Sequence, residues 1–411
     1  MAWLIGATAG AETLEDAWQA ALSTDQRIHA ARDKVAAANF SLESAQRRYR
    51  PSITNKTRYT FLSEDANFSF AGNTFRFLDD EFATTSLTAT MPLYTGGRIA
   101  AGVDAASCQS NAAGWEVQRT RLDIKLNVVV AYVMVLRAQR GVQVAQSSVR
   151  SLEAQDRVVQ SMLKQGAVPR NDLLAVQVEL ANARQQLIRA ENRLANTRAT
   201  YNRVLGRPLE YPVDLAELLM PETSDTPDWL VERGIQARPE LAALAAQANA
   251  LQHQAAKERA ELMPQVGVEG GLFYLESPAI KPNDYATLMF GMEWTPYDGG
   301  VAEAKARSLQ SEASAVIRTR ADTLAAIRLE IQNAWRDEQE SRKRIELAQK
   351  AIEQAEENLR VAKVRFEQGA AINTEVLDAE SLRTRTYDNY YDAIYEAILA
   401  TFRLRRAAGT L

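Results

Sequence analysis

The sequence predicts a mostly helical protein with a smaller β-barrel part, built from one helix–hairpin–helix unit that occurs twice. Three observations predict this fold class. Landmark residues recur at one fixed offset, long stretches carry apolar residues at alternating spacings of three and four, and two pairs of stretches alternate apolar with polar side chains. Alternating spacings of three and four are typical of coiled coils, and apolar–polar alternation is typical of half-buried strands.

The internal repeat is defined by an offset of 203 residues between its two copies. The matching pairs are Tyr94 with Tyr297, Gly96 with Gly299, Gly97 with Gly300, Gly166 with Gly369 and Gly206 with Gly409. Earlier in each copy, Pro51 matches Pro264 at an offset of 213. The first copy therefore holds about ten extra residues between its proline and its glycine pair.

The repeat divides the chain into four segments. Residues 1–11 are predicted to be the remnant of a signal peptide cleaved after Ala11, because a short apolar stretch runs into small residues. Residues 12–206 and 229–411 are the two copies, and the prolines of 207–228 mark a linker. After an opening helix we expect a hairpin at 53–91, a long helix at 98–164 and a return helix at 171–205; the second copy has these at 265–294, 301–367 and 374–407.

The predicted strands have the length and alternation of membrane β-strands, although a soluble hairpin shows the same alternation. Leu288, Phe290 and Met292 alternate with polar or small residues in the last strand. In the first strand, Lys56 and Arg58 are the charged residues. They either line a barrel lumen or are solvated charges near a rim, and the sequence leaves both interpretations open.

Glycines mark the turns of each copy. The pairs that follow Tyr94 and Tyr297 suit a sharp strand-to-helix junction, and no G-x-G-x-x-G pattern follows that would indicate a nucleotide loop. Gln165-Gly166 and Gln368-Gly369 are expected to end the long helices, each of which would span about 100 Å. A return helix then completes a coiled-coil hairpin.

Composition argues against several classes of protein. The formal charge is −4, so no basic surface for nucleic acid is indicated. One cysteine and two distant histidines make a poor metal or catalytic set, so we expect neither an enzyme nor a bound cofactor. We find no apolar run approaching the roughly 20 residues of a membrane-spanning helix.

Four strands cannot close a membrane barrel alone, because open edges in lipid leave backbone groups unpaired. Two copies of the chain would supply eight strands and three would supply twelve. Long helices attached to such a barrel suggest a duct across an aqueous compartment.

The chain resembles the TolC family of outer-membrane efflux proteins. The residues that carry the resemblance are the "YTGGR" and "YDGGV" junctions, the two Gln-Gly tips, "EVLDAE" after the second tip and the closing "AAGTL". It implies a homotrimer with a twelve-stranded barrel in outer-membrane lipid and a coiled-coil α-barrel in the periplasm. It further implies a periplasmic adaptor docked at the tips and an inner-membrane transporter of the RND or ABC type, in an efflux or type I secretion system.

The resemblance also implies a periplasmic gate made of acidic rings at the helical tips. Glu375 and Asp378 are the candidates in the second copy, and Asp172 matches Glu375 in the first. The other interpretation is that these acids favour a helix start, with Thr374 as the N-cap. Some family members lock the tips with an aromatic residue and an arginine; here the matching residues are Phe366 and Ala371, and Arg170 is a possible substitute for the arginine.

Two other classes of protein remain as alternatives. A periplasmic coiled-coil adaptor or scaffold would never enter a membrane, and the alternating hairpins argue against it. An enzyme would need a nucleophile motif, a phosphate loop or clustered His and Cys, and we find none of these. The cargo is not indicated by the sequence.

Overall fold

The computed structural model describes residues 11–221 and 226–411. The predicted signal-peptide remnant, apart from Ala11, and residues 222–225 of the linker lie outside this range. The chain forms two compact units, which do not coincide with the two sequence repeats. Unit 1 comprises residues 1–31, 117–240 and 323–411, and unit 2 comprises residues 32–116 and 241–322.

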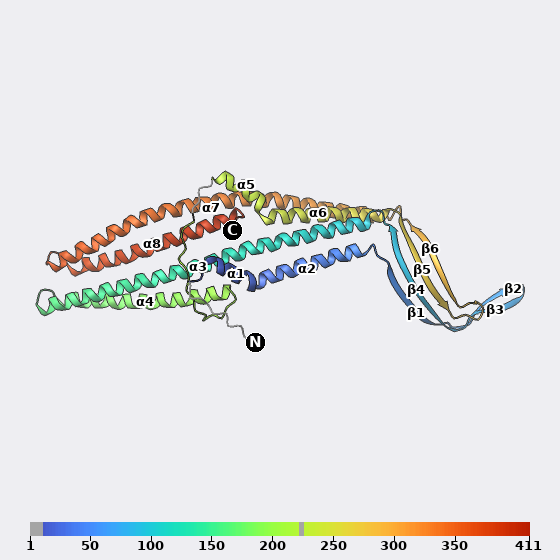
Figure 1. Ribbon diagram of the computed structural model, residues 1–411, viewed down its shortest axis with the longest axis horizontal. Coiled ribbons are helices and arrows are strands. Elements are labelled where there is room, and N and C mark those ends of the chain that lie inside the picture. Colours follow the sequence, from blue (N-terminus) through green and yellow to red (C-terminus); the bar gives the residue numbers. More distant parts are fainter. Residues whose placement is uncertain (1–10, 222–225) are drawn as a thin grey trace. The chain divides into compact units, whose positions relative to one another are not determined.

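Long helices dominate both units (Figure 1). Helices α3 (Arg98–Lys164) and α7 (Val301–Glu367) pass from unit 2 into unit 1. Each is followed in unit 1 by a return helix, α4 (Arg170–Val204) or α8 (Asn373–Ala407). The shorter helices are α1 (Leu14–Thr24), α2 (Gln26–Arg47), α5 (Pro227–Ala237) and α6 (Pro239–Arg259), with a 3-10 turn at Ala260–Leu262.

Each copy opens with two helices where the sequence predicts one. Asp25 separates α1 from α2 and Arg238 separates α5 from α6, because both residues adopt an extended backbone. Helix α1 begins at a capping box in which Thr13 and Asp16 bond each other's backbone.

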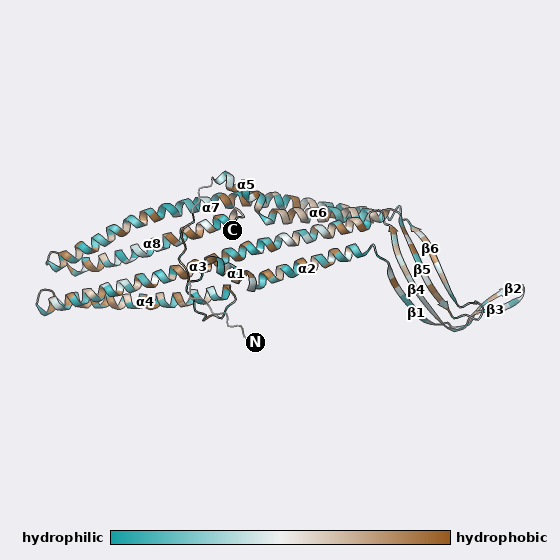
Figure 2. Cartoon of the chain, in the orientation of Figure 1, coloured by the Kyte–Doolittle hydropathy of each residue, from teal (hydrophilic) through white to brown (hydrophobic). Residues whose placement is uncertain are grey.

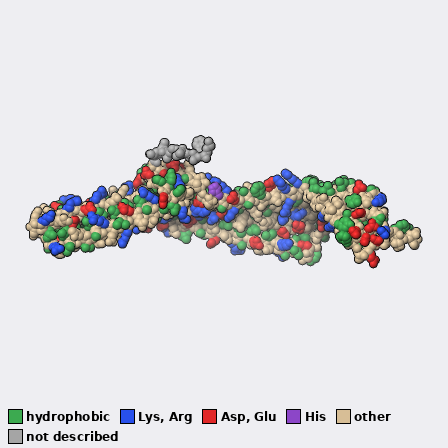
Figure 3. Space-filling view, turned by 90° about the horizontal axis from the view of Figure 1, so that it is seen from below, with side chains coloured by type: hydrophobic (Ala, Val, Ile, Leu, Met, Phe, Trp, Pro, Cys, Tyr) green, Lys and Arg blue, Asp and Glu red, His purple; other side chains and the backbone are tan. Residues whose placement is uncertain are grey.

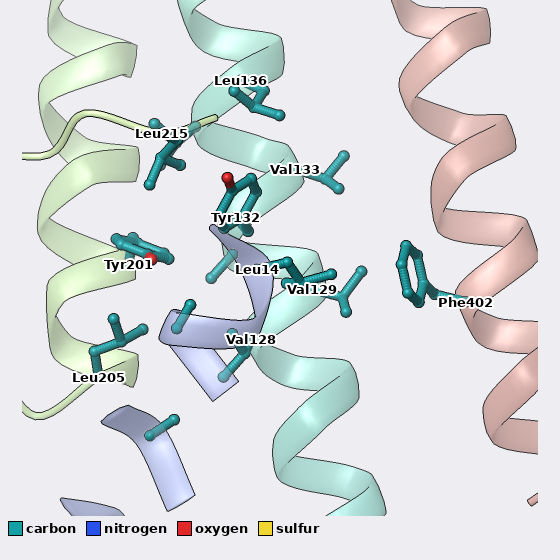
Figure 4. Close-up of a cluster of buried hydrophobic side chains, with 14 of the residues drawn as sticks. Leu14, Val128, Val129, Tyr132, Val133, Leu136, Tyr201, Leu205, Leu215 and Phe402 are labelled. Atoms are coloured by element: carbon teal, nitrogen blue, oxygen red, sulfur yellow. The ribbon is translucent and has the colours of Figure 1, made fainter. Parts of the chain in front are cut away.

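The core of unit 1 forms where α1, α3, α4 and α8 meet (Figure 4). Tyr132 and Tyr201 are fully buried there and contact each other edge to face. The linker closes one side, since Leu215 pairs with Glu12 in a parallel bridge. Tyr132 donates to the carbonyls of Glu12 and Ala216, both at 2.7 Å. These bonds hold the start of the first copy and the linker against the same helix, α3.

A four-stranded antiparallel sheet occupies the end of unit 2 (Figure 1). Its order is β1 (Ser52–Phe61), β4 (Glu81–Tyr94), β5 (Gln265–Leu275) and β6 (Asp284–Glu293). The extra length of the first copy lies in a second hairpin, β2 (Ala66–Phe70) and β3 (Asn73–Leu78), which the sequence reading did not predict. Within the described residues, β1 and β6 are edge strands of the sheet.

The register divides the sheet into an apolar and a polar face, because residues opposite each other in an antiparallel ladder share a face. Figure 2 shows hydrophobic and hydrophilic residues side by side along these strands. The apolar face includes Ile53, Leu87, Ala89, Met91, Val268, Leu272, Leu288, Phe290 and Met292, with Asn55, Thr57, Thr85, Glu81 and Asp284 as polar exceptions. The polar face includes Lys56, Arg58, Thr84, Ser86, Thr88, Thr90, Glu269 and Glu293, with Phe273 and Met289 among its apolar exceptions.

One stretch of α3 is apolar and long enough to cross a membrane as a helix, which the sequence reading did not expect. Half of that stretch is buried, and the core helix of a protein outside the membrane passes the same test. Basic and acidic side chains intermingle on the face shown in Figure 3. That mixture agrees with the small net charge of −4.

Candidate functional site

At two glycine pairs the chain passes from a strand of the sheet into a long helix. Gly96, Gly97, Gly299 and Gly300 all have φ between 58° and 86°. This left-handed backbone favours glycine. Gly96 is also enclosed, since a Cβ built on it would lie 2.2 Å from the Cβ of Met263. The first junction therefore needs glycine for space as well as for conformation.

Asp298 precedes α7, which begins at Val301, at the second junction. Its carboxylate accepts hydrogen bonds from the backbone of Ala302 at 2.7 Å and Gly300 at 2.9 Å. The Ala302 bond is the main cause that lowers the pKa of Asp298 below its usual value. An anion at a helix N-terminus is favoured by the helix dipole. In the first copy, Thr95 matches Asp298 and accepts from Ile99 at 3.4 Å.

Aromatic side chains are exposed at these junctions. Tyr94, Trp294 and Tyr297 are all exposed. The indole of Trp294 donates to the carbonyl of Leu262 at 3.1 Å, so it is held beside the end of the sheet. Aromatic rings with a polar tip are typical of the boundary between hydrocarbon and water.

The helical tips are two matching turns. Gly166 and Gly369 have φ of 72° and 73°. In the first tip, Gly166 donates to Leu163 and Ala167 donates to Met162. The second tip repeats both bonds, and together they form the C-terminal motif in which a left-handed glycine satisfies the last carbonyls. Gln165 and Gln368 precede these glycines and are exposed, so both tips present backbone and amide groups to solvent.

The three candidate gate acids lie just after the tips. Glu375 and Asp378 are exposed in the first turns of α8. Glu375 forms an ion pair of 3.3 Å with Arg365 of the same hairpin. Asp172 is half-buried near the start of α4. Its carbonyl accepts a hydrogen bond of 3.2 Å from Asn373, which brings the two tips together.

Asn373 links the two helical hairpins, and the sequence reading missed it. It is 1% exposed and accepts a bond of 3.1 Å from the buried side chain of Gln155 on α3. The surrounding cluster draws apolar residues from both hairpins, including Val159, Val176, Leu359 and Val376. The two hairpins therefore share one seam at their tips.

A second polar contact between the hairpins lies farther along α8. Glu380 is buried and pairs with Arg383 at 2.7 Å. Ser151 of α3 donates to Glu380 at 2.6 Å and accepts from Lys363 of α7 at 3.0 Å. A buried carboxylate needs such partners, because burial without them is costly. The sequence carried a signal for this group, since Glu380 lies seven residues after Asn373 and so on the same face of α8.

The structure corrects several expectations about the tips. Thr374 is not the N-cap of α8; that residue is Ile372, whose side chain makes no capping bond. Phe366 cannot act as an exposed lock, because it is 3% exposed within the shared seam. Ala371 is half-buried and Arg170 is exposed at the start of α4. Arg365, which the sequence reading did not consider, is the arginine that reaches a candidate acid.

Within residues 11–221 and 226–411, no group of three or more His, Cys, Asp or Glu side chains could hold a metal ion.

A four-stranded sheet with exposed apolar residues, continued by coiled-coil hairpins, defines an outer-membrane channel with a helical extension. The chain belongs to the outer membrane efflux protein family, whose model matches residues 17–207 and 230–410. This membership favours a channel in the outer membrane over the periplasmic adaptor and over an enzyme.

Comparisons with individual proteins agree on the fold. The chain is similar to the outer-membrane channel OprN, with a TM-score of 0.82, 18% identity and coverage of 97% of this chain and 90% of that one. It is equally similar to the outer membrane protein VceC of Vibrio cholerae, with a TM-score of 0.82, 18% identity and 96% of each chain covered. These likenesses confirm the predicted fold class.

One relative comes from the search by sequence. The alkaline protease secretion protein AprF of Pseudomonas aeruginosa is 22% identical over 298 residues. The aligned part spans 70% of this chain and 62% of that protein.

Proposed function

We propose that three copies of this chain form the exit duct of a tripartite efflux or type I secretion system, passing substrate across the periplasm and the outer membrane. The observation that carries the proposal is the two-faced sheet with two open edges. Ile53 and Phe290 are 74% and 73% exposed on its apolar face. No described part of the chain covers that face, whereas lipid would.

Closure requires other copies, since β1 and β6 are unpaired edges and an unpaired edge in lipid is costly. Pairing β6 of one copy with β1 of the next would join sheets without changing their faces. Three sheets would give twelve strands, within the range of membrane barrels. The polar face, including Lys56 and Arg58, would then line the lumen, which supports the first of their two interpretations.

Glu375, Asp378 and Asp172 are proposed to form the periplasmic gate. In a trimer each would contribute three carboxylates to a narrow entrance, and such rings attract cations. The contacts Gln155–Asn373 and Ser151–Glu380 support this proposal, because they hold α8 against the first hairpin close to these acids. The alternative role, stabilising the helix start, remains open to Glu375 but finds no capping side chain at Thr374.

The exposed tips at Gln165, Gly166, Gln368 and Gly369 are proposed to dock a periplasmic adaptor, which would connect the duct to an inner-membrane transporter of the RND or ABC type. Their matching geometry supports this role, because one adaptor surface could bind both tips. The name of AprF refers to protease secretion, which supports the secretion alternative for the cargo.

The duct is tested by detergent extraction, gel analysis without heating and planar-bilayer recording. We expect a heat-modifiable oligomer three times the protomer mass that conducts ions. A water-soluble monomer without conductance would overturn the proposal and would favour the scaffold alternative.

The gate is tested with Glu375→Ala combined with Asp378→Ala. We expect higher conductance and weaker block by divalent cations, because the acidic rings are gone. The matched control is Glu353→Ala with Glu357→Ala, which removes two exposed acids from α7 of the same hairpin. If the control changes conductance and cation block as much as the tip variant, these tip acids are not the gate.

A further inference from the structure

The hairpin β2–β3 carries an aromatic face with no equivalent in the second copy. Phe68 pairs with Phe75 and Phe70 pairs with Asn73, which places Phe68, Phe70 and Phe75 on one face; Phe77, the fourth exposed phenylalanine of the hairpin, lies at the register shift. Ser69, Thr74 and Arg76 form the other face, where the Ser69 and Thr74 hydroxyls lie 3.1 Å apart. Phe68, Phe70 and Phe75 are 57%, 69% and 51% exposed. Three exposed aromatic rings on one short hairpin need a partner.

The hairpin is held in a defined position. Ala71 and Gly72 have φ of 51° and 84°, as a tight two-residue hairpin turn requires. At the base, Arg76 pairs with Asp65 at 3.2 Å and Asp79 at 3.1 Å. Ser277, from the connection between β5 and β6, donates to the carbonyl of Phe77 at 2.6 Å. These bonds fix the hairpin to the sheet, so its aromatic face has a preferred direction.

The aromatic face lies beyond the lipid-spanning part of the sheet. β1 alone has ten residues, enough to cross the hydrocarbon as a tilted strand. The hairpin extends past that strand (Figure 1). An acidic collar separates the two, formed by Glu64, Asp65, Asp79, Asp80 and Glu81. Carboxylates stay in water, so the phenylalanines beyond them lie on the aqueous side and lipid does not cover them.

The geometry of a twelve-stranded barrel supplies another partner. Strands spaced about 4.8 Å apart and tilted by about 40° close at a backbone radius of about 12 Å. A five-residue strand such as β2 extends about 17 Å. A hairpin fixed at the rim is therefore long enough to reach the barrel axis.

We propose that the aromatic faces of three hairpins, one from each copy, pack together over the outer mouth of the barrel and close it. The occupant of each aromatic face is the same hairpin of the two neighbouring copies. The proposal rests on the trimeric duct proposed above and adds a closure at the end opposite the helical tips. The polar faces with Ser69 and Thr74 would remain in water.

Cysteine cross-linking tests the contact. In the full chain with Cys108→Ser, we expect Phe70→Cys to form disulfide-linked dimers when membranes are oxidised. Ser69→Cys is the matched control on the opposite face and should not cross-link. Equal cross-linking of the two variants, or none in an intact conducting trimer, would overturn the cap and leave the duct standing. Loss of the trimer itself would overturn both proposals.

Lipid coverage is the competing outcome. If Phe70→Cys reacts with a membrane-partitioned maleimide and forms no disulfide, the outer leaflet covers the aromatic face and the cap is wrong.

A second experiment measures closure directly. Thr88→Cys, also with Cys108→Ser, would place a thiol on the polar face, where a polymer-linked maleimide too large for porins could reach it from outside the cell. Adding Phe68→Ser, Phe70→Ser and Phe75→Ser should speed labelling by roughly tenfold or more, because reagent enters only while the mouth is open. Adding Ser69→Ala and Thr74→Ala should leave the rate unchanged. The same rate with and without the phenylalanines would overturn the proposal.

Discussion

Gln155 of α3 donates a hydrogen bond of 3.1 Å to Asn373 of α8, and both side chains are buried where the two helical hairpins meet. Asn373 also donates to the carbonyl of Asp172. The Asn373 side chain therefore connects the second hairpin to two residues of the first, one of which, Asp172, is a candidate gate residue. Loss of this contact should therefore weaken the packing of the two hairpins at their tips.

Asn373→Ala should loosen the tips. The change leaves the Gln155 amide without its acceptor and the Asp172 carbonyl without its donor, which costs about 1–3 kcal/mol for a buried group. We expect a lower midpoint in thermal unfolding followed by circular dichroism and a higher open probability in bilayers. The matched control is Asn358→Ala, which alters the exposed residue that corresponds to Gln155 in the second copy. Equal effects of the two changes would contradict a role for the buried contact.

The two glycine junctions should respond differently to alanine. Both Gly96→Ala and Gly299→Ala force a left-handed alanine, which costs about 1–2 kcal/mol. Only at Gly96 would the new Cβ meet another atom, the Cβ of Met263 at 2.2 Å; at Gly299 nothing lies within 4 Å. We therefore expect Gly96→Ala to reduce the yield of heat-modifiable oligomer well below that of Gly299→Ala.

The contact between an alanine at position 96 and the Cβ of Met263 can be tested with a second substitution. Adding Met263→Gly to Gly96→Ala removes the Cβ that is struck and should recover part of the yield, whereas Met263→Ala keeps that atom and should not. Equal yields for the two single glycine variants would show that conformation alone matters at these junctions.

This junction shows how much the sequence could predict. The repeat located Gly96 and Gly299, because a left-handed turn leaves a local mark in the chain. It could not locate Met263, which lies 167 residues from Gly96 in sequence and meets it only in the folded unit. The contact between the hairpins is a similar case: the spacing of apolar residues predicted the coiled coils, but not that Asn373 would bond Gln155 of the other hairpin. Alternation likewise predicted the strands of the four-stranded sheet, whereas the strands of hairpin β2–β3 have only five and six residues.

Acid should weaken unit 1 through Glu240. Burial by itself raises the pKa of Glu240, but its backbone hydrogen bond and the guanidinium groups of Arg238 and Arg406 outweigh burial and lower the pKa below 4.5. The bonds to Arg238 and Arg406 are 3.0 and 3.1 Å long. A carboxyl whose pKa falls on folding stabilises the fold at neutral pH. That stabilisation is lost as pH falls below about 4.5 and through the folded pKa.

Glu240→Gln should lower thermal stability at pH 7 and flatten its decline between neutral pH and pH 4 or below. The measurement is the unfolding midpoint across that pH range. Glu232→Gln, on the exposed side of α5, should keep the native profile. A Glu240→Gln protein that loses stability in acid as steeply as the native chain would show that other carboxyl groups govern this dependence.

The roles of the two faces of the sheet can be distinguished by placing a lysine at either of two adjacent positions of β4. Ala89 lies on the apolar face opposite Ile53 and Gly270, and Thr88 lies on the polar face opposite Thr54 and Gly271. A lysine facing lipid near the middle of the bilayer costs about 2–4 kcal/mol, whereas a lysine facing water in the lumen is tolerated. We expect Ala89→Lys to reduce oligomer recovered from membranes and Thr88→Lys to assemble normally.

Thr88→Lys should also change conduction, because three added positive charges in the lumen favour anions. The measurement is the reversal potential in a salt gradient, with Thr88→Gln as the control of similar length without charge. If Ala89→Lys assembles and shifts selectivity while Thr88→Lys fails to assemble, the apolar face lines the lumen instead. Since the two positions differ by one residue along the same strand, no general loss of strand stability could produce opposite outcomes in assembly and selectivity.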